Sequence, residues 1–146
     1  FRKWERLLWS HHEKFDGSGY FRKLKGENIP VGGRMLAVSD VFDAITSKRH
    51  YRSKMPIEKA IGIIIKDSGT HFDKNMTDAF LSIEADKIIN VMITDSKILD
   101  LNDKVILNKY TLLDLYTLLV EHTEREHTPE EERFISTFLK YYNDPE

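Results

Sequence analysis

Hydrophobic residues recur along most of this chain at intervals of three and four, which is the spacing of one face of an α-helix. Residues 4–15 follow this spacing until Asp16 and Gly17 interrupt it, so a first helix is expected there. Residues 17–33 are rich in glycine, and residues 34–50 then contain no helix-breaking residue. This order predicts a long loop that leads into a second helix.

Two more helices are predicted from the residues that bound them. Pro56 and Gly69 bracket a third helix over residues 57–68, with the proline at its start. Asp73 is expected to cap a fourth helix, which ends near Ala85.

The composition changes after the fourth helix, which divides the chain into residues 1–85 and 86–146. Alternating hydrophobic positions between residues 99 and 107 predict a short hairpin. Two helices are expected after it, over residues 111–126 and 128–142, the second opened by a Thr-Pro-Glu-Glu run. The predicted fold class is therefore mainly α, with a helical C-terminal extension.

The composition narrows the function classes. Twenty-two Lys and Arg residues against 24 Asp and Glu residues give a formal charge of -2, which disfavours a polynucleotide partner. The apolar runs are far shorter than the roughly 20 residues that span a bilayer, so we expect no membrane segment. The chain has no cysteine, which fits the cytoplasmic location that we expect and leaves His, Asp and Glu as metal ligands.

His11 and His12 stand side by side at the end of the first predicted helix. Neighbouring positions on a helix point about 100° apart, so the two imidazoles cannot both be core residues or both be surface residues without a specific reason. We interpret the pair as ligands of two metal ions. Imidazole with carboxylate and no thiolate is typical of iron, manganese or zinc sites.

Asp40 and Asp43 are the strongly polar residues of an otherwise apolar helical stretch. A buried carboxylate needs a cation, so Asp40 is predicted to be a metal ligand. Asp43 could be a second ligand, an acceptor that orients a histidine, or an ion-pair partner of Arg34 or Arg49. Structural ion pairing of both carboxylates is the alternative. If a carboxylate bridges two ions, the centre is of the binuclear hydrolase type, which holds a phosphate and activates a water.

Substrate contacts are expected on both sides of this helix. Arg49 and Arg52 lie at its C-terminal end, where guanidinium groups could bind phosphate oxygens or simply compensate the helix dipole. Gly19 and Tyr20 lie in the glycine-rich loop, which could bring backbone and an aromatic face to a ligand.

Three other histidines are poor candidates for further ligands. His71 follows a predicted turn, and His122 and His127 lie among glutamates. We interpret all three as surface residues rather than ligands.

The histidine pair opens a longer motif that resembles the HD-GYP domains, bacterial metal-dependent phosphodiesterases that act on cyclic di-GMP. His-His-Glu-Lys-Phe-Asp-Gly-Ser-Gly-Tyr is similar to the signature of that family, and later segments follow in the family's order. The resemblance covers about residues 1–84 and rests on residues 11–20, 24–30, 34–44, 46–52 and 68–73.

The resemblance implies an all-α bundle of the HD-GYP type and hydrolysis of cyclic di-GMP to the linear dinucleotide or to GMP. It implies two or three divalent ions, usually iron or manganese, and a sensory or receiver domain of a two-component response regulator as a partner. The implied metal ligands are His11, His12 and Asp40, and the implied substrate-binding residues are Gly19, Tyr20, Arg49 and Arg52.

Three departures from the family pattern limit this expectation. The upstream half of the family, with its His-Asp dyad, is absent from this chain, so we expect the chain to be inactive unless that half is supplied. Phe21 and Lys74 stand where the family has prolines. The alternatives are a degenerate module that binds cyclic dinucleotides without catalysis, and an interaction domain that forms a homodimer through Leu112 and Leu119.

Overall fold

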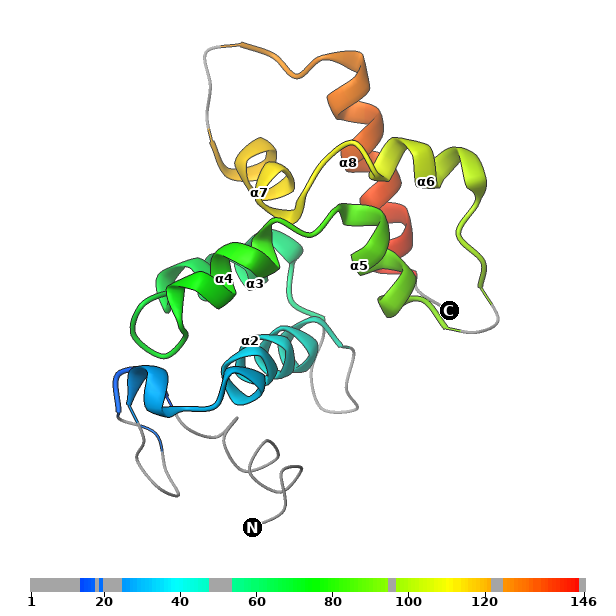
Figure 1. Cartoon of the computed structure of the whole chain (residues 1–146). Helices are drawn as coiled ribbons and strands as arrows, with labels where there is room; N and C mark the ends of the chain where they lie inside the picture. The colour runs from blue at the N-terminus through cyan, green and yellow to red at the C-terminus, as the bar shows by residue number, and fades with distance from the viewer. Residues whose placement is uncertain are drawn as a thin grey trace. The chain divides into compact units, whose positions relative to one another are not determined.

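The computed structural model describes residues 14–17, 19, 25–47, 54–94, 97–121 and 125–144. Within these ranges the chain is all-α and contains no β-strand (Figure 1). The elements are η1 (Gly26–Asn28), α2 (Val31–Thr46), α3 (Ile57–Lys66), α4 (Lys74–Leu81), α5 (Ala85–Met92), α6 (Leu101–Leu107), α7 (Leu112–Val120) and α8 (Pro129–Asn143). The chain divides into two compact units, Phe1–Phe80 (unit 1) and Leu81–Glu146 (unit 2). None of the described helices combines the length and the apolar character needed to cross a bilayer.

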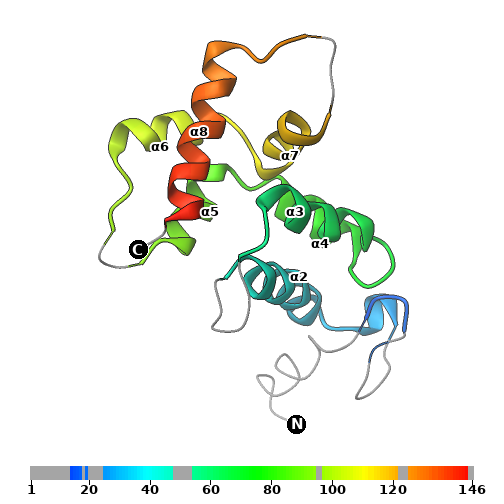
Figure 2. The same ribbon diagram turned by 180° about the vertical axis from the view of Figure 1, so that it is seen from behind.

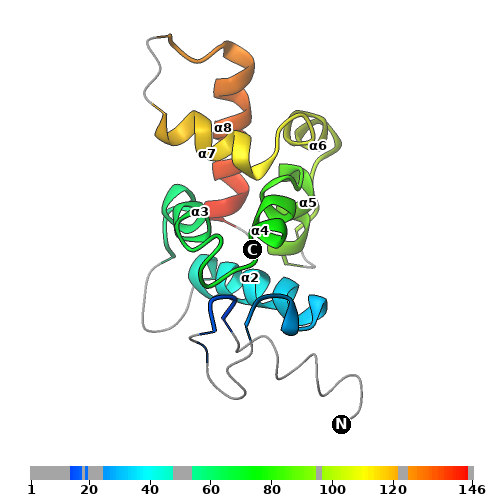
Figure 3. The same cartoon turned by 60° about the vertical axis from the view of Figure 1, so that its left-hand side comes forward.

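Unit 1 is built on α2, with α3 and α4 on the same side of it (Figure 3). Its core joins Ala37 and Val38 of α2 to Ile64 of α3 and to Phe72, which precedes α4. The ring of Phe42 meets the ring of Phe80 edge-on, with centroids 5.0 Å apart. These contacts leave the opposite face of α2 uncovered by the described helices of unit 1.

The second, third and fourth predicted helices are confirmed, with shifted ends. Helix α2 begins at Val31 rather than Arg34, because Pro30 supplies an extended N-cap and the following glycines fall in the first turn. Pro56 is the N-cap of α3 rather than its first residue. Asp73 caps α4 as predicted, since its Oδ1 accepts a hydrogen bond from the Asn75 amide at 2.9 Å.

Helix α5 was not predicted from the sequence. The fourth helix was expected to run to about Ala85, but it ends at Leu81, and Ala85 begins a new helix. Two backbone bonds fix this break: Ala85 N–H donates to Tyr110 at 2.9 Å, and Leu112 N–H donates to Ile83 at 3.1 Å. Both partners lie far along the chain, so no local pattern marks the turn.

The predicted hairpin between residues 99 and 107 is wrong, because this segment forms helix α6. Asp100 caps the helix, and its carboxylate accepts hydrogen bonds from the Asn102 and Asp103 amides at 2.8 and 3.4 Å. The alternation was misleading because Leu101 is 78% exposed, so it does not belong to a buried face.

Unit 2 is organised around α8, which packs along α5 and α6 (Figure 2). Its core is aromatic: Phe134 and Phe138 are fully buried, and Tyr142 is 2% exposed. The predicted cap of α8 is confirmed as a capping box, in which Thr128 and Glu131 each bond the other's backbone amide.

Helix α7 is shorter than predicted and ends at Val120 rather than near Glu126. A capping box between Thr111 and Asp114 starts it. Leu112 is fully buried, as is Leu115, so the apolar face of α7 is used for packing within the protein and Leu112 is not available for a contact between two copies.

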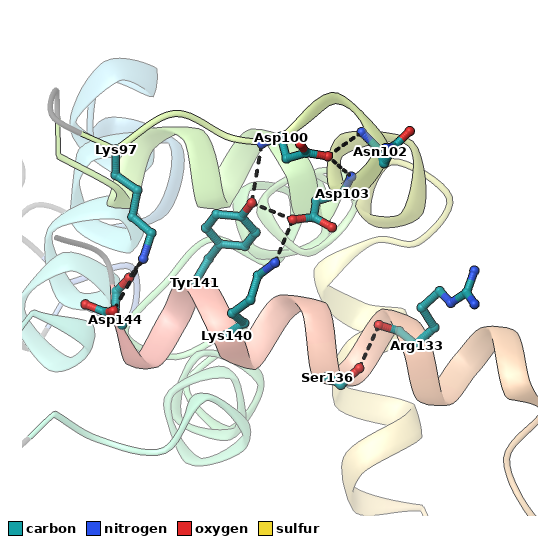
Figure 4. Close-up of polar contacts among 9 residues, drawn as sticks. All are labelled: Lys97, Asp100, Asn102, Asp103, Arg133, Ser136, Lys140, Tyr141 and Asp144. Carbon is teal, nitrogen blue, oxygen red and sulfur yellow. Dashed lines mark hydrogen bonds and ion pairs between the residues drawn. The ribbon is translucent and has the colours of Figure 1, made fainter.

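A polar cluster joins α6 to α8 inside unit 2 (Figure 4). The Tyr141 hydroxyl donates to Asp103 at 2.5 Å and accepts from the Asp100 amide at 3.3 Å, and Lys140 donates to the same Asp103 oxygen at 2.7 Å. Burial is the main cause of the raised pKa of Tyr141, and the hydrogen bond to the Asp103 carboxylate raises this pKa further. The cluster thus fixes the start of α6 against the end of α8.

Candidate metal centre

The predicted site residues fall unevenly on the described chain. Asp40 and Gly19 lie within it, and the other five lie outside the described residues: His11, His12, Tyr20, Arg49 and Arg52. The site can therefore be built from α2, which carries Asp40, and from the segment that directly follows the histidine pair.

Asp40 lies on the exposed face of α2, and Asp43 lies on the same face less than one turn later. The expectation that these carboxylates are buried is wrong, because α2 buries only one stripe of small and apolar residues. Exposure removes the electrostatic need for a protein cation beside them. It also leaves the Asp40 carboxylate accessible to a ligand from solvent.

Arg34 does not pair with Asp43, which was one of the expectations for it. Arg34 instead forms an ion pair with Asp73, and the two side chains are 11% and 5% exposed. Asp43 accepts a hydrogen bond from the Ser47 hydroxyl at 3.1 Å, so it helps to close the C-terminal turn of α2.

One large apolar side chain lies beside Asp40 on the exposed face of α2. Leu36, one turn before Asp40, is 37% exposed. An apolar side chain beside a carboxylate lowers the local dielectric once both are covered, which strengthens the attraction between the carboxylate and a cation.

The segment after the histidine pair is held by backbone hydrogen bonds to a distant loop. Phe15 N–H donates to His71 at 3.0 Å, and Asp16 N–H donates to Thr70 at 2.7 Å. The Phe15 carbonyl in turn accepts from Gly26 N–H at 2.8 Å. The chain is therefore fixed on both sides only three residues after His12.

A tight turn occupies residues 14–17, so Lys14 and Phe15 are not helical, although the first helix was predicted to include them. Gly17 N–H donates to the Lys14 carbonyl at 2.9 Å, and Gly17 has a φ of 85°, which favours glycine. Gly19, two residues on, is buried. This agrees with the predicted interruption at Asp16 and Gly17 and places the glycine loop directly after the fixed segment.

His71 and His127 are partly exposed. The His71 ring lies 3.5 Å from an Asp67 carboxylate oxygen, and the His127 ring lies 3.1 Å from one of Glu132. His122 lies outside the described residues. Among the positions that the structure places, no three His, Asp or Glu side chains gather closely enough to bind a metal ion.

The donor chemistry still fits a divalent ion. Asp40 offers an exposed carboxylate on α2, and carboxylate with imidazole suits divalent iron, manganese or zinc. The contacts that sequence reasoning missed are those of the 67–73 loop and of Arg34, because main-chain partners leave no mark in side-chain patterns.

A comparison with models of protein families identifies the family of this chain. The model described as HD domain matches residues 2–76, just over half of the chain. The chain belongs to the HD domain family. The match contains the histidine pair, the glycine loop, α2, α3 and the loop that receives the Phe15 and Asp16 hydrogen bonds.

Several proteins that are named by their activity are similar to part of this chain. The chain is 48% identical over 80 residues to a cyclic di-GMP phosphodiesterase of Vibrio cholerae serotype O1. It is 40% identical over 72 residues to a 3'3'-cGAMP-specific phosphodiesterase of the same organism. It is 44% identical over 71 residues to a cyclic di-GMP phosphodiesterase response regulator of Xanthomonas campestris pv. campestris.

These similarities concern about half of this chain and a small part of each relative. The aligned regions cover 55%, 49% and 49% of this chain, and 16%, 14% and 19% of the three relatives. The assignment to the HD domain family therefore rests on residues 2–76, and the matched region does not include helices α5–α8.

Proposed function

We propose that this chain forms part of a metal-dependent phosphodiesterase that hydrolyses cyclic di-GMP in bacterial signalling. The observation that carries the proposal is 48% identity over 80 residues to a protein named as a cyclic di-GMP phosphodiesterase, in a chain whose HD domain spans the histidine pair and Asp40. In this reading, residues 1–85 are the C-terminal part of an HD-GYP-like domain and residues 86–146 are an extension.

The proposed metal ligands are His11, His12 and Asp40. Asp40 suits this role because it is exposed on a helix that is packed on its opposite side. The fixed backbone at Phe15 suits the role of the histidines, because ligands must be held rigidly to select a coordination geometry.

The proposed substrate contacts are Gly19, Tyr20, Arg49 and Arg52. A cyclic dinucleotide presents two phosphodiesters and two planar bases. Arginine forks match phosphate oxygens, and an aromatic ring next to a glycine offers a stacking surface. This residue set therefore matches both chemical features of the substrate.

HD domains are metal-dependent, and we propose iron or manganese, two or three ions in the complete site. When bound, such ions polarise a phosphodiester and make water more acidic. Three ligands are too few for two ions, so other protein segments must supply more. We propose an HD half that provides them, together with a sensory or receiver domain, in the cytoplasm; a homodimer remains part of this proposal.

Hydrolysis assays on the protein that contains this chain test the proposal. Wild type with Mn²⁺ or Fe²⁺ is expected to convert cyclic di-GMP to the linear dinucleotide or to GMP, and His12→Ala is expected to lose this activity. His127→Ala is the matched control, because His127 pairs with Glu132 in unit 2. Equal activity of wild type and His12→Ala would contradict the proposal.

The same assay tests substrate choice, since a relative named for 3'3'-cGAMP is also 40% identical. We expect faster hydrolysis of cyclic di-GMP than of 3'3'-cGAMP. A protein that binds cyclic di-GMP calorimetrically without metal and never cleaves it would instead be a degenerate binding module, with Phe21 in place of the family's proline as the motivating difference.

A further inference from the structure

Arg34 occupies a position in unit 1 that neither the predicted ligands nor the predicted phosphate contacts explain. Its guanidinium is nearly buried and has two partners. Nε donates to the Ile29 carbonyl at 3.0 Å, and Nη1 pairs with the Asp73 carboxylate. The two partners belong to different segments, the end of η1 and the start of α4.

Those two segments meet again at Phe15. The loop that ends at Asp73 accepts the Phe15 amide through His71, and the segment that ends at Ile29 donates to the Phe15 carbonyl through Gly26. The hydrogen bonds therefore close a ring: from Phe15 to the 67–73 loop, across Arg34, and back through residues 26–29. We call this the Arg34 ring.

The 67–73 loop and residues 26–29 are each held by their own backbone hydrogen bonds, so the ring can fix the position of Phe15 relative to α2. Phe72 N–H donates to Asp67 at 3.1 Å and Gly69 N–H donates to Phe72 at 2.8 Å, which closes the 67–73 loop on itself. Ile29 N–H donates to Gly26 at 3.1 Å, which closes the other arm. Arg34 is the side chain that connects them, and a planar fork can serve two partners at fixed angles.

Arg34 also belongs to α2, six residues before Asp40. The ring thus joins the segment three residues after His12 to the helix that carries Asp40. We propose that Arg34 is a positioning residue, which sets the spacing between the histidine pair and Asp40 without touching metal or substrate. This inference rests on the proposed metal site.

Three variants test the inference in the protein that contains this chain. Arg34→Met leaves Asp73 as a buried charge without its cation, so the double variant Arg34→Met/Asp73→Asn is made beside it, in which the amide oxygen keeps the cap of α4. Arg34→Lys retains the charge but lacks the fork. Lys74→Met is the matched control, because it removes an exposed ion pair with Asp78 on the same helix.

The first measurement is hydrogen exchange without metal. The Arg34→Met variants are expected to lose protection at the Phe15 and Asp16 amides while the α3 amides keep theirs; Lys74→Met is expected to match wild type. The second measurement is Mn²⁺ affinity by electron paramagnetic resonance. It is expected to fall about tenfold, the lower end for residues that support metal ligands, with a smaller loss in Arg34→Lys.

Unchanged protection at Phe15 and Asp16 would overturn the inference directly. Lost protection with wild-type Mn²⁺ affinity would also overturn it, because the ring would then be structural only. A wild-type protein, with the rest of the site present, that binds no Mn²⁺ at all would overturn the proposed ligand set, and the role of Arg34 with it. That result is distinguishable, since the exchange measurement uses no metal.

Discussion

The two units of the molecule start their helices in different ways. In unit 2, α6, α7 and α8 each begin with a side chain that accepts hydrogen bonds from the first turn, namely Asp100, Thr111 and Thr128. In unit 1, α2 and α3 begin after prolines that make no such bond. Among the described helices, each unit has one exception: Asp73 caps α4 in unit 1, and α5 in unit 2 starts without a side-chain cap and depends on Tyr110. Most helix starts of unit 2 are therefore specified by neighbouring residues, and most of those of unit 1 are not.

The two units also differ in their cores. The core of unit 2 is aromatic, with the Phe134 ring packed between Tyr110 and Phe138 at centroid distances of 4.5 and 6.5 Å. The core of unit 1 is mostly aliphatic, and its central helix α2 keeps Asp40 on an exposed face. The comparison shows that the candidate ligand lies on a helix face that its own unit does not use for packing.

The largest expected effect comes from breaking the aromatic core. Phe138→Ala should lower the free energy of unfolding of unit 2 by about 3–5 kcal/mol, because a fully buried ring leaves a cavity. Chemical denaturation with residue-resolved hydrogen exchange would measure it, and α3 in unit 1 should keep its protection. Loss of protection in both units together would show that they unfold as one.

A smaller effect is expected at the cluster that joins α6 to α8. Tyr141→Phe removes a hydrogen bond to the Asp103 carboxylate and should cost about 1.5–3 kcal/mol. Lys140→Met is the control, since its exposed ion pair with the same carboxylate should contribute less than about 1 kcal/mol. Denaturant unfolding of both variants measures the difference, and a larger loss in Lys140→Met would contradict the assignment.

These contacts also show which parts of the fold the sequence could predict. Thr128 and Asp73 were identified as caps because a cap and its partners lie within three residues. The start of α5 was missed, since it depends on Tyr110, and α6 was misread because alternation over a few residues fits either a strand or a short helix.

The candidate site likewise has features that the sequence predicted and features that it did not. The identities of His11, His12 and Asp40 as candidate ligands came from residue type and order, and they remain predictions. The exposure of Asp40 was predicted incorrectly, because the number of apolar neighbours in a sequence does not say which of them are covered. The Arg34 ring was not foreseen, since its bonds run mostly to main-chain atoms.

A still smaller effect is expected in acid, where unit 2 should respond through Glu131. The pKa of Glu131 is lowered from 4.5 to about 2. The main cause is the hydrogen bond from the Arg125 guanidinium, and the bond from the Thr128 amide adds to it. A lowered pKa in the folded state contributes stability above pH 4.5, and that contribution is lost as the pH falls toward 2. Arg125→Met should flatten this loss, which unfolding free energies measured across the window would show.

If wild type and Arg125→Met lose stability equally between pH 4.5 and 2, the fork between Arg125 and Glu131 is not the source of the lowered pKa. Glu130, beside it on α8, provides the control as Glu130→Gln, because its ion pair with Lys109 is exposed on both sides. That variant should leave the acid response unchanged.

The smallest effect on stability is expected at the candidate metal ligand. Asp40→Asn should change the free energy of unfolding by no more than about 0.5 kcal/mol, because the side chain is exposed on α2. The same variant should weaken Mn²⁺ binding, measured by titration. A large loss of stability without metal would place Asp40 among the structural residues and would remove the contrast between the two units.

The hydrogen bonds from Phe15 and Asp16 to the 67–73 loop determine which fragments of this chain can keep the site supported. A fragment ending at Arg52 would include every residue proposed to bind metal or phosphate, yet it would lack the carbonyls of Thr70 and His71 and the carboxylate of Asp73. A piece of this chain that keeps the support of these residues therefore extends at least through Asp73. The family match ends three residues later, at residue 76, so the inherited segment includes the support of the site as well as its ligands.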